Sequence, residues 1–162
     1  MRLVVMGVSG AGKSAVGERL AAALGVAFGE GDKLHPAANV AKMAAGHPLD
    51  DADRAPWLDR IAAWLVAHPA GVITCSALRR AYRDRLRSAA PDTCFVLLDV
   101  PRATLEERLH KRQNHFMPPA LLDSQLAALE PLDEGEHGLT IAPTGEVDTT
   151  VEAILRRLKA PA

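Results

Sequence analysis

The 162-residue sequence has few aromatic side chains, few cysteines and almost no net charge. Its formal charge at pH 7 is −1, so the molecule as a whole has no strong attraction for nucleic acid or for an anionic membrane. Its apolar runs are much shorter than a membrane span, and residues 1–6 are too few for a secretion signal. We therefore expect a cytoplasmic protein that binds neither nucleic acid nor membrane.

The two cysteines offer little for redox or disulfide chemistry. Cys75 and Cys94 each lie inside an apolar run that is typical of a buried strand. Thiols in such runs are more often inert packing residues than partners in a bridge. The hydrophobic content of 48% is ordinary for a globular chain. We expect one domain, residues 1–162, around a single core.

Glycines near the N-terminus form the most informative motif. Residues 7–14 read Gly-Val-Ser-Gly-Ala-Gly-Lys-Ser, which fits the phosphate-loop pattern Gly-x-x-x-x-Gly-Lys-Ser/Thr. An apolar run precedes the motif and helically spaced apolar residues follow it. Glycine lets the backbone turn its N–H groups toward a polyphosphate, and the positive end of the next helix adds to the attraction. The predicted nucleotide-binding residues are Gly7, Val8, Ser9, Gly10, Ala11, Gly12, Lys13, Ser14 and Ala15.

Two side chains of this motif carry the chemistry of triphosphate binding. Lys13 is expected to reach the β- and γ-phosphates, and the Ser14 hydroxyl is expected to be a ligand of Mg²⁺. A plain glycine turn between a strand and a helix is the alternative, but the Lys-Ser pair at this spacing argues against it. The motif thus predicts a bound nucleoside triphosphate with Mg²⁺ as its cation.

Apolar runs and helical segments alternate along the whole chain. This alternation favours an α/β fold in which a parallel sheet is covered on both faces. Ligands of such sheets gather beyond the carboxyl ends of the strands. Thr149, followed by Glu152, predicts a capping box at the start of the last helix. The five predicted strands are residues 3–6, 26–28, 72–75, 94–100 and 139–142.

Two acidic residues follow the second predicted strand. Asp32 is the candidate base for an attacking hydroxyl, and Glu30 is expected nearer the metal. The metal-site prediction comprises Ser14, Glu30 and Asp32. The alternative is that Asp32 only caps the turn before a helix at Pro36. The third strand lacks a Walker-B aspartate, which strengthens the metal assignment and argues against a motor or large assembly ATPase.

A dense group of arginines follows the third predicted strand. Arg79, Arg83 and Arg87 recur every four residues and so share one face of a helix. A solvated helix face is the alternative for any one of them. As a group they favour a small anionic substrate, because arginine binds carboxylates through two hydrogen bonds. The patch is too short and too poor in aromatics for nucleic acid.

A second pair of arginines lies after the fourth strand. Arg108 and Arg112 stand four residues apart, followed by a Pro pair that suits a hinge. On a flap spanning approximately residues 108–130, they would neutralise charge on the transferring phosphoryl group. The alternative is that they form exposed ion pairs with Glu106 or Glu107.

Asp50, Asp51 and Asp53 have two interpretations. They could bind a divalent cation, but acidic residues also favour the first turn of a helix, here the one that contains Trp57. The helix interpretation is preferred.

Taken together, these residues resemble the gluconate kinases among the phosphate-loop small-molecule kinases, over nearly the whole chain. The most specific stretch begins at Gly31 with Gly-Asp-Lys-Leu-His-Pro and continues, with gaps, through Asn39 to Leu58. The other matching segments are residues 75–79, 82–84, 86–87, 115–116, 124–125 and 129–131. The resemblance implies sheet order 2-3-1-4-5 and commonly a homodimer. It also implies ATP-dependent phosphorylation of D-gluconate at its 6-hydroxyl, giving 6-phospho-D-gluconate and ADP.

Gluconate is a polyol with one carboxylate, so its site needs an arginine and several hydrogen-bonding side chains. Which arginine binds the carboxylate is left open. An alternative acceptor is shikimate or a nucleoside monophosphate, although Trp57 and Tyr82 offer few rings for base stacking. A non-catalytic nucleotide switch is the other alternative. The predicted substrate-binding residues are Asp32, His35, Lys42, Arg54, Ser76, Arg79, Arg83, His115 and Gln125, and the predicted catalytic residues are Lys13, Asp32, Arg108 and Arg112.

Overall fold

The structure is a computed structural model that describes residues 1–111 and 119–160. Its centre is a parallel sheet with strand order β2-β3-β1-β4-β5. This order confirms the one implied by the family resemblance. The strands are β1 (Arg2–Met6), β2 (Ala27–Glu30), β3 (Gly71–Thr74), β4 (Thr93–Leu98) and β5 (Gly138–Ile141).

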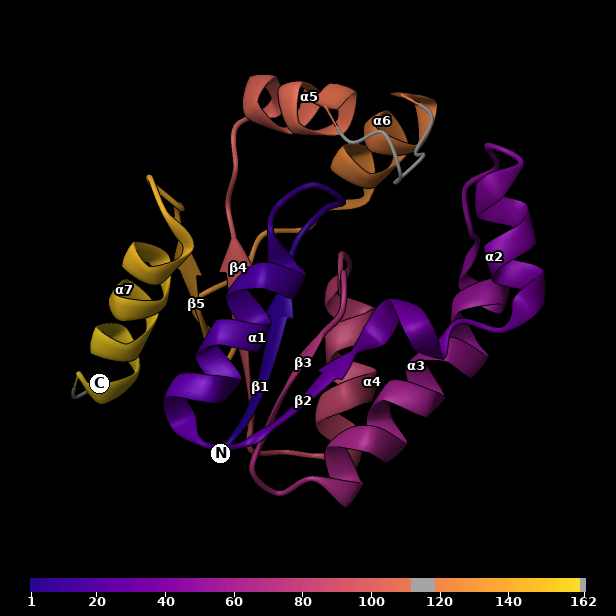
Figure 1. Ribbon diagram of the computed structural model, residues 1–162. Coiled ribbons are helices and arrows are strands. Elements are labelled where there is room, and N and C mark those ends of the chain that lie inside the picture. The colour runs from indigo at the N-terminus through magenta and orange to yellow at the C-terminus, as the bar shows by residue number, and fades with distance from the viewer. Residues whose placement is uncertain (112–118, 161–162) are drawn as a thin grey trace.

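Helices cover both faces of the sheet, as Figure 1 shows. Alternate residues of β1 point to opposite faces, as the pleat requires. Leu3 and Val5 pack in the apolar cluster with α1 (Lys13–Leu24) and α7 (Val147–Lys159). Val4 and Met6 pack in the cluster with α3 (Asp51–Ala67) and α4 (Arg80–Ala89). The near-continuous apolar strands are thus explained by burial on both sides.

The remaining elements gather around the carboxyl ends of the strands. In Figure 1, α5 (Arg102–Lys111) and α6 (Pro119–Ala128) lie beyond these ends, above the loop that joins β1 to α1. The 3₁₀ turn η1 (Gly31–Leu34) leads into α2 (Ala37–Ala44), which stands at one side of the same edge. The site predicted beyond the strand ends is therefore bounded by the phosphate loop, α2 and α6.

The starts of two helices test the capping predictions. At α3, the Asp50 carboxylate accepts from the Asp53 N–H and the Asp53 carboxylate accepts from the Asp50 N–H, so the preferred helix interpretation is confirmed. At α7, the predicted capping box is wrong. The helix begins at Val147, because this partly buried side chain packs against the apolar cluster and extends the helix before Thr149.

The cysteines are placed as the sequence predicts. Cys75 and Cys94 are buried and unbridged, as predicted. Burial raises the pKa of the Cys75 thiol to about 12, which leaves it unreactive at neutral pH. In these two ranges, no helix is long and apolar enough to cross a membrane.

Candidate active site

The phosphate loop connects the buried end of β1 to the first turn of α1. Gly10 and Gly12 have φ values of 86° and 93°, in the region that favours glycine. Gly12 is the N-cap of α1, so the loop ends where the free N–H groups and positive end of the helix begin. The Lys13 ammonium donates to the Val8 carbonyl oxygen at 3.0 Å. The sequence motif therefore forms the anion-binding geometry that it predicts.

Ser14 and Glu30 meet beside the phosphate loop. The Ser14 hydroxyl donates to Glu30 Oε2 at 3.1 Å, joining the start of α1 to the end of β2. A hydroxyl and a carboxylate are hard oxygen ligands, which suit Mg²⁺. Within the described ranges, no three His, Cys, Asp or Glu side chains cluster as a complete metal cage. This pair thus fits a cation that takes its other ligands from phosphates and water.

Gly31 explains how Asp32 is positioned. The Gly31 N–H donates to Thr74 Oγ1 at 3.1 Å, and the Trp57 indole N–H donates to the Gly31 carbonyl at 2.8 Å. A Cβ at position 31 would lie 1.9 Å from the Thr74 carbonyl oxygen, so only glycine allows η1 to pass this close to β3. The N-cap residues of η1 and α2 are Glu30 and Pro36, so Asp32 is the N-cap of neither helix.

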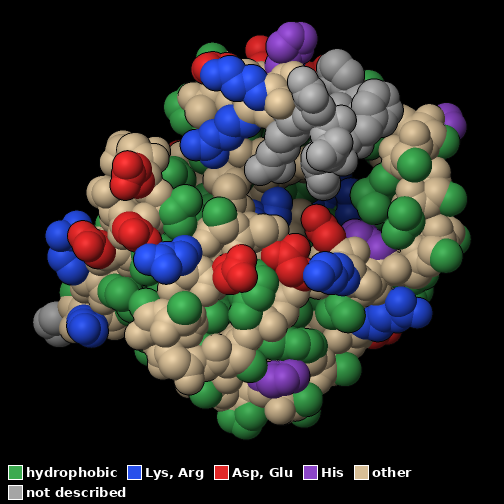
Figure 2. Space-filling view, in the orientation of Figure 1, with side chains coloured by type: hydrophobic (Ala, Val, Ile, Leu, Met, Phe, Trp, Pro, Cys, Tyr) green, Lys and Arg blue, Asp and Glu red, His purple; other side chains and the backbone are tan. Residues whose placement is uncertain are grey.

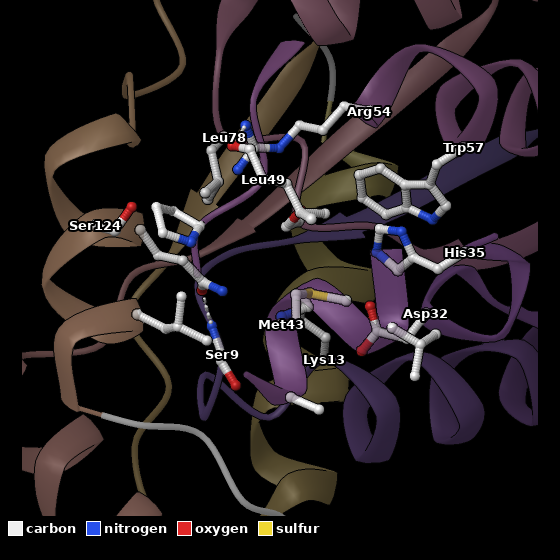
Figure 3. Close-up of a pocket in the computed structure, with 16 residues that line it drawn as sticks. Ser9, Lys13, Asp32, His35, Met43, Leu49, Arg54, Trp57, Leu78 and Ser124 are labelled. Carbon is white, nitrogen blue, oxygen red and sulfur yellow. Dashed lines mark hydrogen bonds between the residues drawn. The ribbon is translucent and has the colours of Figure 1, made fainter. Parts of the chain in front are cut away.

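A cavity of about 320 Å³ opens between the phosphate loop, α2, α3 and α6. Figure 2 shows a hollow beside α2 where acidic, basic and histidine side chains meet. Lys13 and Asp32 lie near one end of the cavity in Figure 3, and Arg54 lies toward the other. The predicted residues that line it are Ser9, Lys13, Asp32, His35, Arg54, Ser76 and Gln125, and the other lining residues are Val40, Met43, Ala44, Pro48, Leu49, Trp57, Leu78, Leu121 and Ser124.

His35 is held against the wall of the cavity by an aromatic stack. Its ring lies 4.1 Å from that of Trp57, centroid to centroid, at an interplanar angle of 15°. Burial lowers the pKa of His35; the charge of Asp32 opposes this shift and that of Arg54 adds to it. His35 is therefore neutral at physiological pH, and it can donate through only one of its two ring nitrogens.

Arg54 is fixed by two neighbours on the cavity wall. Its Nη1 donates to the Leu49 carbonyl at 2.6 Å and to the Tyr82 hydroxyl at 3.2 Å. The Tyr82 hydroxyl in turn donates to Asp51 at 2.5 Å. A guanidinium held on one side by such contacts can present its other N–H groups to a carboxylate.

The helices above the strand ends also contact the phosphate loop. Arg108 Nη1 donates to the Gly10 carbonyl at 3.0 Å. The Ser9 N–H donates to Gln125 Oε1 at 2.7 Å, the hydrogen bond dashed in Figure 3. Glu106 pairs with Arg102, and Glu107 pairs with Lys111. The alternative ion pairs of Arg108 with these two glutamates are therefore not formed among the described residues. The predicted site residues Arg112 and His115 lie outside the described residues.

Comparison with known proteins decides between the kinase subgroups. Residues 3–132 match a family model described as an AAA domain. The chain is 47% identical over 162 residues to the gluconokinase of Gluconobacter oxydans, covering 98% of this chain and 91% of that protein. It is 39% identical over 160 residues to the thermoresistant gluconokinase of Escherichia coli, covering 93% and 91%. The chain belongs to the gluconokinase family.

Solved structures agree with this membership. A gluconokinase from Sinorhizobium meliloti superposes with a TM-score of 0.87 at 45% identity, covering 97% of this chain and 92% of that one. A sugar kinase from Janibacter sp. HTCC2649 gives 0.91 at 42% identity, covering 97% and 93%. Shikimate kinase from Aquifex aeolicus gives 0.62 at only 18% identity over 98% and 96% of the two chains, a likeness of fold alone.

Three of the predicted substrate-binding residues that the structure describes do not line the cavity. Lys42 pairs with Asp53 instead. Arg79 lies 3.9 Å from Glu130. Arg83 has a side-chain exposure of 0% because it is buried against Glu136. Helical spacing correctly placed Arg83 and Arg87 on one face, since both bind Glu136, but this face is turned away from the cavity.

Asn39 contacts a residue of the site, although it was not among the predicted site residues. Its buried amide contacts His35, which lies four residues earlier. The spacing of four residues could have predicted this contact, because side chains four positions apart along a helical stretch can touch.

Proposed function

We propose that this chain catalyses the ATP-dependent phosphorylation of D-gluconate at its 6-hydroxyl, giving 6-phospho-D-gluconate and ADP. The observation that carries the proposal is the polarity of the cavity, with Lys13 and Asp32 toward one end and Arg54 toward the other. Gluconate fits this arrangement end to end, because its 6-hydroxyl and its carboxylate are at opposite ends of the carbon chain. Relatives that are named gluconokinases support the same acceptor.

In the proposed reaction, the oxygen of the 6-hydroxyl bonds to the γ-phosphorus while the bond from that phosphorus to the β–γ bridging oxygen breaks. Asp32 accepts the hydroxyl proton. Lys13 and Arg108 stabilise negative charge on the phosphoryl oxygens, and Arg112 has the same proposed role. Positioning and electrostatics account for most of the catalysis in this class of reaction.

Magnesium belongs to the proposal as the cation of ATP. Ser14 and Glu30 would hold it, because their contact already brings a hydroxyl and a carboxylate together beside the phosphate loop. When bound, Mg²⁺ supplies neutralisation of phosphate charge. Asp32 lines the acceptor cavity, which favours its role as a base over the metal role also predicted for it.

Four side chains are proposed to bind gluconate itself. Arg54 binds the carboxylate, while His35, Ser76 and Gln125 address hydroxyl groups. Because Lys42, Arg79 and Arg83 point elsewhere, they are left out of this set. His115 stays a prediction.

Replacing Arg54 by methionine should raise the KM for gluconate by roughly 10–100-fold, because hydrogen bonds to charged groups contribute about 1.5–3 kcal/mol. The KM for ATP should stay near that of the wild type. Steady-state kinetics with each substrate varied in turn measures both. Arg85→Met is the matched control, since Arg85 binds Asp59 on the exposed surface. An unchanged KM for gluconate would assign the carboxylate to another residue.

Coupled ADP release tests the function as a whole. We expect gluconate to stimulate release strongly, while shikimate and nucleoside monophosphates do not. Stimulation by one of the other acceptors would replace the substrate assignment, and ATP binding without any stimulated release would favour the nucleotide switch.

The proposal also takes in expectations about the domain, the flap, the location and the oligomeric state. These are a single domain over residues 1–162, a flap at approximately 108–130 that closes over the nucleotide, and a cytoplasmic homodimer. The contacts of Arg108 and Gln125 with the phosphate loop support the flap. Light scattering in solution tests the homodimer.

A further inference from the structure

Asn39 does not line the cavity, but it controls a residue that does. Its side chain is buried, with 4% relative exposure, in α2. The amide nitrogen Nδ2 donates to the backbone carbonyl of Asp53 at 2.9 Å and lies 3.2 Å from His35 Nδ1. Both hydrogens of this amide therefore have a partner.

The two contacts fix the position of a proton. A backbone carbonyl can only accept, so the Asn39 amide must turn its NH₂ group, and not its oxygen, toward Asp53. The same NH₂ group then faces His35, where Nδ1 must be the acceptor. A neutral imidazole whose Nδ1 accepts carries its hydrogen on Nε2.

The plane of the His35 ring is fixed as well. It stacks on Trp57, and Trp57 is itself held by its hydrogen bond to Gly31. Asp32 and Arg54 are the charged groups that act on the ring. Within the described ranges, no side chain or backbone group hydrogen-bonds Nε2. The ring thus presents a single donor from the wall of the cavity.

We propose that Asn39 is a positioning residue that keeps the hydrogen of His35 on Nε2, so that His35 donates a hydrogen bond to an oxygen of the bound acceptor and does not act as a base. This inference rests on the proposed acceptor site. It divides the work in the cavity: His35 donates and Asp32 accepts, and Asp32 is the one carboxylate among the described lining residues.

The same chain holds a second histidine–tryptophan stack, in which the partner of Nδ1 is an acceptor and not a donor. His68 lies 4.0 Å from Trp64 at 21°, but its Nδ1 is 2.7 Å from the Trp64 carbonyl oxygen. Because that oxygen can only accept, His68 must carry its hydrogen on Nδ1. Stacking on tryptophan therefore does not select the tautomer; the partner of Nδ1 does.

Nitrogen NMR of the protein labelled with ¹⁵N-histidine tests the tautomers without any activity measurement. We expect His35 to show hydrogen on Nε2 and His68 to show it on Nδ1. Spectra of His35→Gln and His68→Gln assign the two rings. A wild-type His35 with hydrogen on Nδ1, or with both nitrogens protonated at neutral pH, would overturn the proposal.

A kinetic cycle tests whether Asn39 acts through His35. Asn39→Asp keeps the size of the side chain but offers Nδ1 an acceptor, so the hydrogen of the neutral ring should move from Nε2 to Nδ1. We expect the KM for gluconate to rise about 10-fold, with the KM for ATP unchanged. In a His35→Gln background, whose amide still donates, Asn39→Asp should have little further effect.

An equal effect of Asn39→Asp in both backgrounds would mean a merely structural role and would overturn the proposal. The two hypotheses fail separately. If gluconate is not the acceptor, gluconate does not stimulate ADP release by the wild type, while the nitrogen spectrum of His35 still shows the hydrogen on Nε2. If the tautomer assignment is wrong, the spectrum changes while wild-type turnover of gluconate stays.

Discussion

Replacing Asp32 by asparagine is expected to lower kcat for gluconate phosphorylation by roughly 10²–10⁴-fold, the usual contribution of a general base. The substitution keeps the shape of the side chain and removes its ability to take the hydroxyl proton. ATP should still bind, because the phosphate loop and the Ser14–Glu30 pair are untouched. Single-turnover ADP formation and ATP binding, measured on the same preparation, separate the two effects.

Asp59→Asn is the matched control for this experiment. Asp59 lies in α3, the helix that carries Arg54, but it pairs with Arg85 at the exposed surface. Its replacement should leave kcat within a factor of about two, because exposed pairs contribute little. A kcat near the wild-type value for Asp32→Asn would reject Asp32 as the base and leave the acceptor hydroxyl to lose its proton without help from the protein.

The parts of the molecule that the sequence predicted well are those set by local chemistry. Residues 7–14 have one geometry that satisfies three glycines and a Lys-Ser pair, so the loop follows directly from the motif. The apolar runs predicted the strands to within a few residues because buried strands need side chains of this kind on both faces. The motif after β2 predicted Asp32 and His35 as site residues. Its Gly31 is also set by local chemistry, since there is no space for a side chain where this residue passes β3.

Other residues depended on contacts that no local pattern contains. Helical spacing shows that Arg83 and Arg87 share a face, but it cannot show that this face meets Glu136, 49 to 53 positions away along the chain. Lys42 likewise pairs with Asp53, a contact that the sequence pattern does not contain. Charged side chains are thus the residues whose roles are hardest to assign, because a basic residue has the same sequence pattern whether it pairs with an acidic side chain of the protein or with a substrate carboxylate.

The buried arginine therefore has a structural task, which is to hold the loop that follows β3. Arg83 Nε and Nη2 bind the two carboxylate oxygens of Glu136 at 2.7 and 2.9 Å, and Nη1 donates to the Ala77 carbonyl at 2.9 Å. Ala77 has φ of 46°, the one left-handed value among the non-glycine residues that the structure describes. Because Ser76 and Leu78 on either side of it line the cavity, Arg83 shapes the acceptor site from behind.

Replacing Arg83 by methionine is expected to lower the free energy of unfolding by about 3–5 kcal/mol, because Glu136 would be left as a buried charge without its main partner. This is a large share of the total stability of about 5–15 kcal/mol that is usual for a domain. Urea unfolding followed by circular dichroism measures the loss. Arg85→Met is again the control and should change stability by less than about 1 kcal/mol. A loss no larger than that of the control would mean that water or Arg87 compensates the carboxylate fully.

The pH dependence of stability gives the same network a second, independent test. Burial by itself would raise the pKa of Glu136, but hydrogen bonds from Arg83, the Asp133 backbone and Arg87 outweigh burial and lower it to about 2, from an ordinary value of 4.5. The unfolded chain then binds more protons than the folded one between these two values, so stability falls as the pH drops from 4.5 toward 2. Glu136→Gln should remove this component, giving a flatter decline than the wild type. Equal slopes would show that the carboxylate titrates alike in both states, and the ion pair with Arg83 would then contribute nothing to folding.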